Sequence, residues 1–182
     1  MLDKFFASII ILIIFPFILI VCIIIYVFDG LPIFFTQRRI GRNNLGFKIY
    51  KLRTMKNKSK DVATHLLKSN SHFTITGPIL RKLSIDEIPQ LFNIIKGDMV
   101  FFGPRPALHN QYDLIRIRKR FGIETIKPGV TGWAQVNGRD ILSIEEKAYL
   151  DKYYLENKSP FLNVKILFMT IKQVITAKNV SH

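Results

Sequence analysis

The feature that most constrains this chain is a long uncharged stretch near its beginning. From Phe5 to Phe28 there is no Asp, Glu, Lys or Arg, and nearly every residue is aliphatic or aromatic. A helix of that length extends about 36 Å, which exceeds the roughly 30 Å hydrocarbon core of a bilayer. The stretch is too long for the core of a signal peptide, and no small-residue cleavage site follows it. The sequence therefore predicts a membrane helix that stays attached to the protein.

Pro16 lies near the middle of this stretch. A proline inside a helix removes one backbone hydrogen bond and usually produces a kink. Membrane helices tolerate such a residue, so the residues alone favour a kinked helix that spans the bilayer over a re-entrant hairpin. On these grounds the short N-terminus can lie on either side of the membrane.

The rest of the chain is strongly basic. The formal net charge is +14, with 27 Lys and Arg against 13 Asp and Glu. The first 34 residues contribute −1 of that charge, so the remaining residues carry +15. Dense positive charge directly after a membrane segment indicates that the following domain is cytoplasmic. It also indicates a polyanionic neighbour, such as anionic lipid, nucleic acid or a phosphorylated ligand.

The change in composition divides the chain into a membrane helix with an interfacial anchor over 1–34 and a cytoplasmic domain over 35–182. Alternation and turn residues predict a short β-hairpin, and helical periodicity predicts several helices, so the fold class is α+β and mainly helical. The hairpin is expected over 34–55, an exposed polar segment over 57–73, and helices over 112–121, 143–154 and 161–178.

Two of the expected helices leave alternatives open. The helix over 112–121 is basic, and its charged side is either solvated or in contact with lipid headgroups or phosphate. The helix over 161–178 carries an apolar stripe with lysines opposite. That stripe either packs on the core or lies in the headgroup layer.

Two adjacent carboxylates, Asp86 and Glu87, precede an apolar segment in the middle of the chain. Ser84 together with Glu87 has the spacing of a capping box, and Pro89 suits the first turn of a helix. We therefore expect a helix to begin near Asp86, with both carboxylates at its positive end. The simplest interpretation is that Asp86 caps this helix.

The surroundings of the two carboxylates favour a second interpretation. Cations lie on both sides, at Arg81, Lys82 and Arg105. A carboxylate beside a helix N-terminus and arginines stays ionised, so it can serve as a nucleophile or bind a divalent metal ion. The same cations would hold phosphate groups.

A glycine-rich stretch, 128–139, lies nearer the C-terminus and is expected to be a loop. It has neither phosphate-loop nor dinucleotide-binding spacing. One interpretation is a packed turn with Trp133 in the core. The other is a loop that brings Gln135, Asn137 and Arg139 towards a polar ligand. The spacing favours neither over the other.

Taken in order, these motifs resemble the bacterial sugar transferases, the small monotopic phosphoglycosyl transferases. The resemblance covers nearly the whole chain, and the order and spacing of several motifs make it specific. The motifs are Thr36–Gly41, Lys51–Met55, Leu83–Leu91, Gly97–Asp98, Gly103–Pro106, Pro128–Gly132 and Gln135–Arg139.

The resemblance implies an enzyme that moves a sugar phosphate from a UDP-sugar to undecaprenyl phosphate, releases UMP and uses Mg²⁺ as cofactor. It implies that Asp86 is the nucleophile that forms an aspartyl phosphosugar, and that Glu87 assists at the metal site or in acid–base steps. Both carboxylates are then candidate metal ligands. Arg81, Arg105 and Arg139 are the cations expected around the donor, with Gln135 as a further candidate for substrate binding.

The resemblance also implies a monotopic membrane protein with interfacial amphipathic helices. Its membrane helix is expected to be re-entrant, broken at Pro16 and cytoplasmic at both ends, which reverses the preference for a spanning helix. The implied location is the cytoplasmic face of the bacterial inner membrane, at the first membrane step of glycan assembly. The implied partners are the two substrates, membrane lipids and downstream glycosyltransferases, without nucleic acid. The alternative is a membrane-anchored basic protein that binds anionic lipid or nucleic acid without catalysis.

Overall fold

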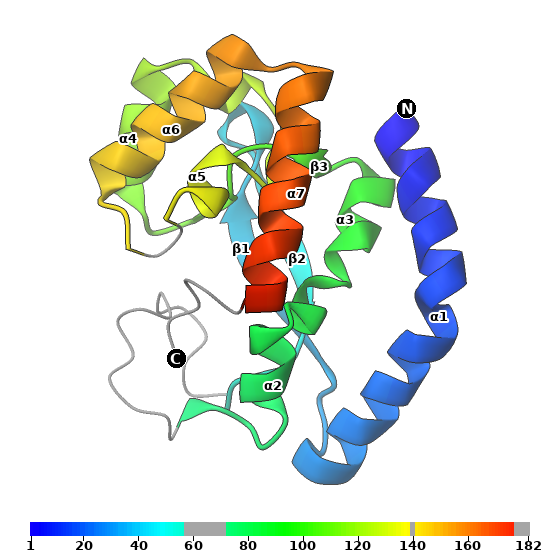
Figure 1. The fold of residues 1–182 in the computed structure, drawn as a ribbon. Coiled ribbons are helices and arrows are strands. Elements are labelled where there is room, and N and C mark those ends of the chain that lie inside the picture. The colour runs from blue at the N-terminus through cyan, green and yellow to red at the C-terminus, as the bar shows by residue number, and fades with distance from the viewer. Residues whose placement is uncertain (57–71, 139–140, 177–182) are drawn as a thin grey trace. The chain divides into compact units, whose positions relative to one another are not determined.

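The computed structural model describes residues 1–56, 72–138 and 141–176 (Figure 1). Most of the expected polar segment over 57–73 lies outside these residues, as does Arg139. The helices are α1 Leu2–Asp29, α2 Gly77–Lys82, α3 Gln90–Lys96, α4 Tyr112–Arg120, α5 Trp133–Val136, α6 Ile144–Asn157 and α7 Pro160–Thr176. The strands are β1 Phe34–Ile40, β2 Gly46–Leu52, β3 Val100–Phe102, β4 Ala107–Leu108 and β5 Gly129–Thr131, with short 3-10 turns η1 Arg42–Asn44, η5 Ile85–Glu87 and η6 Ile123–Thr125. The predicted class, mainly helical with small sheets, is confirmed.

The chain forms two compact units that alternate along the sequence. The first contains Met1–Gln37 and Lys48–Gly97. The second contains Arg38–Phe47 and the described part of Asp98–Asn179. The hairpin β1–β2 thus contributes its base to the first unit and its tip to the second. The division into domains at residue 34 stays a prediction.

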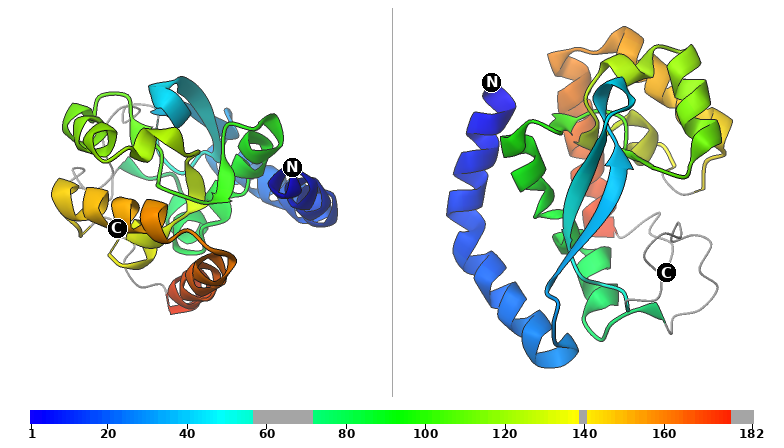
Figure 2. Two further views of the ribbon diagram at one scale, coloured as in Figure 1. Left: turned by 90° about the horizontal axis from the view of Figure 1, so that it is seen from above. Right: turned by 180° about the vertical axis from the view of Figure 1, so that it is seen from behind.

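Helix α1 is 28 residues long and continues through Pro16. It follows a bowed path (Figure 2). Large apolar side chains are exposed along the helix. For example, Leu12 is 78% exposed and Val27 is 67% exposed. Within the described residues, α1 is the helix with the length and composition to cross a membrane. This agrees with the predicted membrane helix, while the re-entrant path stays a prediction.

The first unit is built on one end of α1, strand β2 and helix α2. Val21 and Ile25 of α1 pack with Leu52 of β2 and Leu80 of α2. Helix α3 also contacts α1. The element that carries the two adjacent carboxylates, η5, lies between α2 and α3 in the chain. The apolar packing therefore joins α1 to the elements on either side of that turn.

The predicted hairpin is present as β1 and β2, and β4 extends it to a sheet of order β2–β1–β4. Strand β4 is antiparallel to β1, with Arg39 opposite Leu108. At the tip of the hairpin, Asn43 and Asn44 have φ angles of 54° and 58°. Asparagine tolerates this left-handed conformation better than most residues, which explains a turn at this point.

The second unit holds a parallel pair, β3 with β5, in which Val100 lies opposite Gly129. Its main core cluster contains Val136, Tyr154, Leu162 and Ile166. A second cluster joins β4, α4 and α6 through Ala107, Leu114 and Ala148. These clusters explain why α4, α6 and α7 form where their periodicity predicts them.

The stretch 128–139 is more ordered than predicted, because it contains β5 and α5. Close backbone approach accounts for its glycines. A Cβ atom on Gly129 would lie 2.2 Å from the backbone nitrogen of Gly103, and one on Gly132 would lie 2.0 Å from the Gly103 oxygen. Trp133 is partly buried against the core, as one of the two interpretations predicted.

Helix α7 packs on the core with part of its apolar stripe, and a position in the headgroup layer stays a prediction. Leu162 and Ile166 are buried in the core. Phe161, Phe168 and Ile175 remain 81%, 68% and 78% exposed. The helix thus packs on the second unit with one side, while the apolar residues of another side face outward.

Candidate active site

The adjacent carboxylates lie in a 3-10 turn, Ile85–Glu87, rather than at the start of the predicted helix. Ser84 has φ of 55° and its side chain makes no capping hydrogen bond, so the predicted capping box is wrong. Helix α3 starts only at Gln90, with Pro89 as its N-cap residue. A proline inside the helix would clash with the carbonyl group four residues earlier. Pro89 therefore delays the α-helix and leaves the carboxylates in the turn before it.

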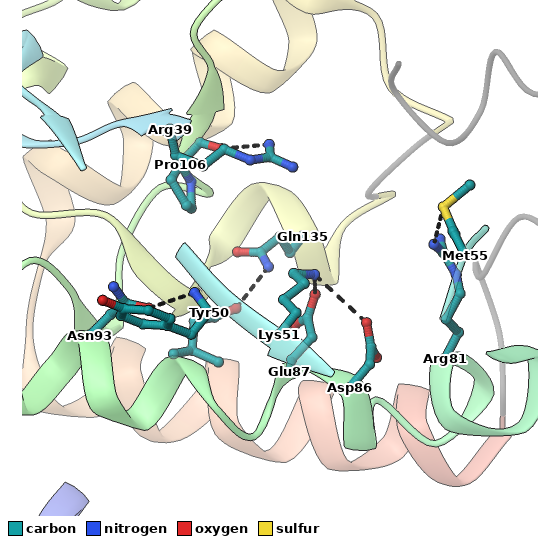
Figure 3. A network of polar contacts seen from close by, with 11 residues as sticks. Arg39, Tyr50, Lys51, Met55, Arg81, Asp86, Glu87, Asn93, Pro106 and Gln135 are labelled. Atoms are coloured by element: carbon teal, nitrogen blue, oxygen red, sulfur yellow. Dashed lines mark hydrogen bonds and ion pairs between the residues drawn. The ribbon is translucent and has the colours of Figure 1, made fainter. Parts of the chain in front are cut away.

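Asp86 and Glu87 surround the ammonium group of Lys51 from strand β2 (Figure 3). Lys51 Nζ lies 2.6 Å from Glu87 Oε1 and 3.8 Å from Asp86 Oδ2. Asp86 is only 6% exposed. Lys51 was not predicted as a site residue, although it belongs to the motif Lys51–Met55. Its partners are 35 residues away in the chain or more, so local patterns could not indicate them.

Asn93 of α3 holds strand β2 beside the carboxylates. The backbone nitrogen of Tyr50 donates to Asn93 Oδ1 at 3.1 Å (Figure 3). Asn93 Nδ2 donates to the carbonyl oxygen of Lys48 at 2.7 Å. The side chain of Asn93 is fully buried. The amide therefore takes the place of a neighbouring strand and fixes the part of β2 that carries Lys51.

Arg81 lies at the end of α2, in the same unit as the carboxylates. Its Nη1 atom lies 3.8 Å from the sulfur of Met55. Its guanidinium carbon lies 5.4 Å from the centre of the Phe73 ring, a distance at which cation–π attraction operates. These contacts orient a cation near the turn that contains Asp86. Its predicted contact with the donor stays a prediction.

The two carboxylates fit a magnesium site of the usual kind. Mg²⁺ in proteins is typically held by one or two carboxylates together with substrate phosphates and water. In the described part of the chain, no group of three or more His, Cys, Asp or Glu side chains has the arrangement of a metal site. The role of Asp86 and Glu87 as magnesium ligands stays a prediction.

Arg105 belongs to the second unit, in the run that follows β3. Two arginines hold the backbone of this run. Arg118 Nη1 donates to the carbonyl oxygen of Arg105 at 2.8 Å, and Arg39 Nη1 donates to that of Pro106 at 3.1 Å. The position of Arg105 is thus fixed through carbonyl groups of its own segment.

Arg118 is held in turn by Asp151 of α6. Its Nε and Nη2 atoms donate to Asp151 Oδ2 at 2.9 and 2.6 Å. Asp151 is 1% exposed, and this burial raises the pKa of its carboxyl group, while Arg118 opposes the rise. Arg118 therefore departs from both interpretations of the basic helix 112–121, because it forms an inward ion pair. Arg116, Lys119 and Arg120 are exposed, as the solvated interpretation predicts, and their contact with headgroups or phosphate stays a prediction.

Two further residues, Gln135 and Arg139, were predicted to bind the substrate. Gln135 is 9% exposed and donates from Nε2 to the carbonyl oxygen of Val130 at 3.0 Å. It thus holds the middle residue of β5, and its predicted role in substrate binding stays a prediction. Arg139 lies outside the described residues. The structure groups Asp86, Glu87 and Arg81 in the first unit, and Arg105 and Gln135 in the second.

Comparison with known proteins identifies the family. Residues 1–177 match the family model of the bacterial sugar transferases. The chain belongs to the bacterial sugar transferase family. This sugar transferase is 43% identical over 153 residues to the "Uncharacterized sugar transferase EpsL" of Bacillus subtilis (strain 168), which covers 84% of the chain and 75% of the relative.

Other relatives carry more specific names. This sugar transferase is 34% identical over 192 residues to the exopolysaccharide production protein ExoY of Rhizobium meliloti (strain 1021), covering 97% of the chain and 84% of the relative. It is 34% identical over 163 residues to the undecaprenyl-phosphate galactose phosphotransferase of Salmonella typhimurium (strain LT2), covering 81% of the chain. The match spans only 34% of that longer relative.

Proposed function

We propose that this sugar transferase moves a sugar phosphate from a UDP-sugar to undecaprenyl phosphate through a covalent intermediate on Asp86. The observation that carries the proposal is the contact of Lys51 with two adjacent carboxylates, of which Asp86 is buried, in a member of the bacterial sugar transferase family. The undecaprenyl-phosphate galactose phosphotransferase supports the acceptor by its name. The UDP-glucose:undecaprenyl-phosphate glucose-1-phosphate transferase of Escherichia coli (strain K12), 33% identical over 177 residues, supports the class of donor.

In the first half of the reaction, a carboxylate oxygen of Asp86 attacks the β-phosphorus of the donor. The new bond joins Asp86 to the sugar phosphate, and the bond between the β-phosphorus and the bridging oxygen breaks. UMP leaves with the bonding electrons. Lys51 places a positive charge beside the attacking group, where the phosphates of the donor bring negative charge.

In the second half, a phosphate oxygen of undecaprenyl phosphate attacks the phosphorus of the intermediate. The bond to Asp86 breaks, the carboxylate is regenerated, and the sugar remains on the lipid as a diphosphate ester. A two-step route suits a soluble donor and a lipid-bound acceptor, because each meets the same carboxylate in turn.

The remaining groups of the site bind and neutralise phosphate. When bound by Asp86 and Glu87, Mg²⁺ supplies positive charge that offsets the charge of the diphosphate. Arg81, Arg105 and Arg139 would contact the phosphates and the sugar, because guanidinium groups bind phosphate through paired hydrogen bonds. Gln135 is the further candidate for contact with the donor.

The proposed location is the cytoplasmic face of the bacterial inner membrane. Exposed apolar side chains along α1 support membrane insertion, and the basic sequence after it supports a cytoplasmic site. A re-entrant path of α1 would keep both of its ends on that face. Downstream glycosyltransferases would extend the lipid-linked product. Family membership favours this function over a basic membrane-anchored protein without catalysis.

Release of UMP from a UDP-sugar tests the proposal. The purified protein should release UMP in the presence of Mg²⁺, and the Asp86→Asn variant should release none while it folds and binds membranes as before. The matched control is Asp113→Asn, an exposed aspartate in the first turn of α4. Turnover by Asp86→Asn at the wild-type rate would contradict the role of Asp86. A screen of UDP-sugars in the same assay identifies the donor.

A further inference from the structure

Arg53, which directly follows β2, binds the C-terminal end of the membrane helix. Its Nη1 atom donates to the carbonyl oxygen of Leu31 at 2.8 Å, and its Nη2 atom donates to that of Gly30 at 2.7 Å and to that of Asp29. The arginine is 7% exposed. The last carbonyl groups of a helix lack helical partners and carry partial negative charge. The buried guanidinium group of Arg53 therefore satisfies the end of α1 directly.

The side chain of Asp29 makes a second connection at the same point. Its Oδ1 atom accepts a hydrogen bond from the backbone nitrogen of Ile75 at 2.7 Å. Its Oδ2 atom accepts from the backbone nitrogen of Thr76 at 3.3 Å and from the hydroxyl group of Thr76. Thr76 is the N-cap residue of α2. The last residue of the membrane helix thus holds the first turn of the helix that leads to the carboxylates.

We call Arg53, Asp29 and Thr76 the clasp. Only one residue separates Arg53 from Lys51, whose ammonium group contacts both Glu87 and Asp86. Leu52, the residue between Lys51 and Arg53, belongs to a buried apolar cluster. Ile85, the residue before Asp86, packs against that cluster. The clasp and the carboxylates are therefore joined by one short strand segment and by a packed apolar cluster, which relates the position of the carboxylates to the end of α1.

The clasp lies at the C-terminal end of α1, and the segments that it joins carry the exposed apolar side chains of Leu31, Ile75 and Ile79. In the last two turns, Ile23, Val27 and Phe28 are 54%, 67% and 58% exposed. The next residues, Asp29 and Gly30, are engaged by the clasp. Exposed apolar side chains belong in the hydrocarbon, while the polar clasp belongs at its boundary. The clasp consequently relates the level of Asp86 to the surface of the lipid.

We propose that the clasp sets the depth of Asp86 at the membrane, and that it is needed for transfer to the lipid acceptor but not for reaction with the soluble donor. Arg53 is thus a positioning residue. The inference rests on the proposed function. It extends that function because the second half-reaction depends on the depth of Asp86 in the membrane, whereas the first does not. A soluble donor reaches Asp86 at any level, whereas the phosphate of a lipid acceptor is confined to the headgroup layer.

The test separates the two half-reactions in lipid nanodiscs. UMP release without acceptor measures the first, and transfer of radiolabelled sugar phosphate to added undecaprenyl phosphate measures the second. For Arg53→Gln we expect UMP release within twofold of the wild type and transfer to lipid reduced at least tenfold. Asp29→Asn should show the same split more weakly, because it weakens the clasp without changing its size. The matched control is Arg120→Gln at the exposed end of α4, which should change neither.

A depth measurement tests the clasp without reference to activity. A fluorescent label at Lys82→Cys, in a Cys22→Ala background, reports its depth through quenching by lipid-bound nitroxides. Arg53→Gln and Asp29→Asn should change the quenching, and Arg120→Gln should not. Equal losses of both half-reactions, or unchanged quenching and unchanged transfer in both clasp variants, would overturn the inference. Failure of the proposed function appears differently, as absence of UMP release by the wild type.

Discussion

Lys51 Nζ lies 2.6 Å from Glu87 Oε1 and 3.8 Å from Asp86 Oδ2. One ammonium group thus forms ion pairs with two carboxylates that are adjacent in the chain. The shorter contact is with Glu87, so the proposed nucleophile Asp86 lies farther from the cation that the pair shares. This arrangement leads to a first prediction about the cation itself.

Replacing Lys51 with Met should slow UMP release by about 10- to 100-fold. A hydrogen bond to a charged group contributes about 1.5–3 kcal/mol, and roughly 1.4 kcal/mol corresponds to a factor of ten in rate. Lys51→Arg should retain part of the activity, because it keeps the charge in a different shape. Initial rates at saturating UDP-sugar measure the effect.

The control for this change is Lys48→Met, on the same strand. Lys48 is exposed, and the contact of this residue with Asn93 is made by its backbone oxygen. Its variant should keep the wild-type rate of UMP release. Equal loss in both variants would indicate a general effect of charge, and full activity in Lys51→Met would refute a role for Lys51.

Replacing Asn93 with Ala should destabilise the protein by at least about 1–3 kcal/mol, since buried polar groups of β2 would lose their partner. Those groups are the backbone nitrogen of Tyr50 and the carbonyl oxygen of Lys48. Denaturant unfolding in detergent micelles measures the change. Asn157→Ala, at the exposed end of α6, should cost much less. Similar losses for both variants would argue against this special role of Asn93.

Asp151 should make stability fall as pH rises. Burial raises the pKa of its carboxyl group in the folded protein, so the folded state binds this proton more tightly than the unfolded state does. The contribution is complete below the pKa of the unfolded carboxyl group and is lost as pH rises through the folded pKa. The free energy of unfolding of the wild type, minus that of Asp151→Asn, should therefore decrease over that range. A difference that grows with pH would mean that Arg118 outweighs burial.

The sequence predicted the elements whose signals are local. Alternation located the hairpin, helical periodicity located α4, α6 and α7, and the uncharged run located α1. The carboxylate turn was mispredicted because two local signals competed: Ser84 and Glu87 have capping-box spacing, but Ser84 adopts a left-handed conformation and the α-helix starts only after Pro89. A spacing rule gives no weight to that backbone conformation.

The contacts that shape the site depend on residues distant in the chain. Arg118 lies among the basic residues of α4, a composition typical of an exposed helix. Its side chain nevertheless points inward, where it forms an ion pair with Asp151. Lys51 and Arg53 belong to one strand-like motif, but their partners are the carboxylate turn and the end of α1. Periodicity describes one element at a time, so these pairings become visible only once the elements are packed.

The most direct test of the proposed mechanism is mass spectrometry of the protein after incubation with UDP-sugar and Mg²⁺ in the absence of acceptor. The mechanism predicts a mass increase equal to one sugar phosphate, located by peptide mapping at Asp86, and its loss when undecaprenyl phosphate is added. An active protein that never carries sugar phosphate on Asp86 under these conditions would contradict it.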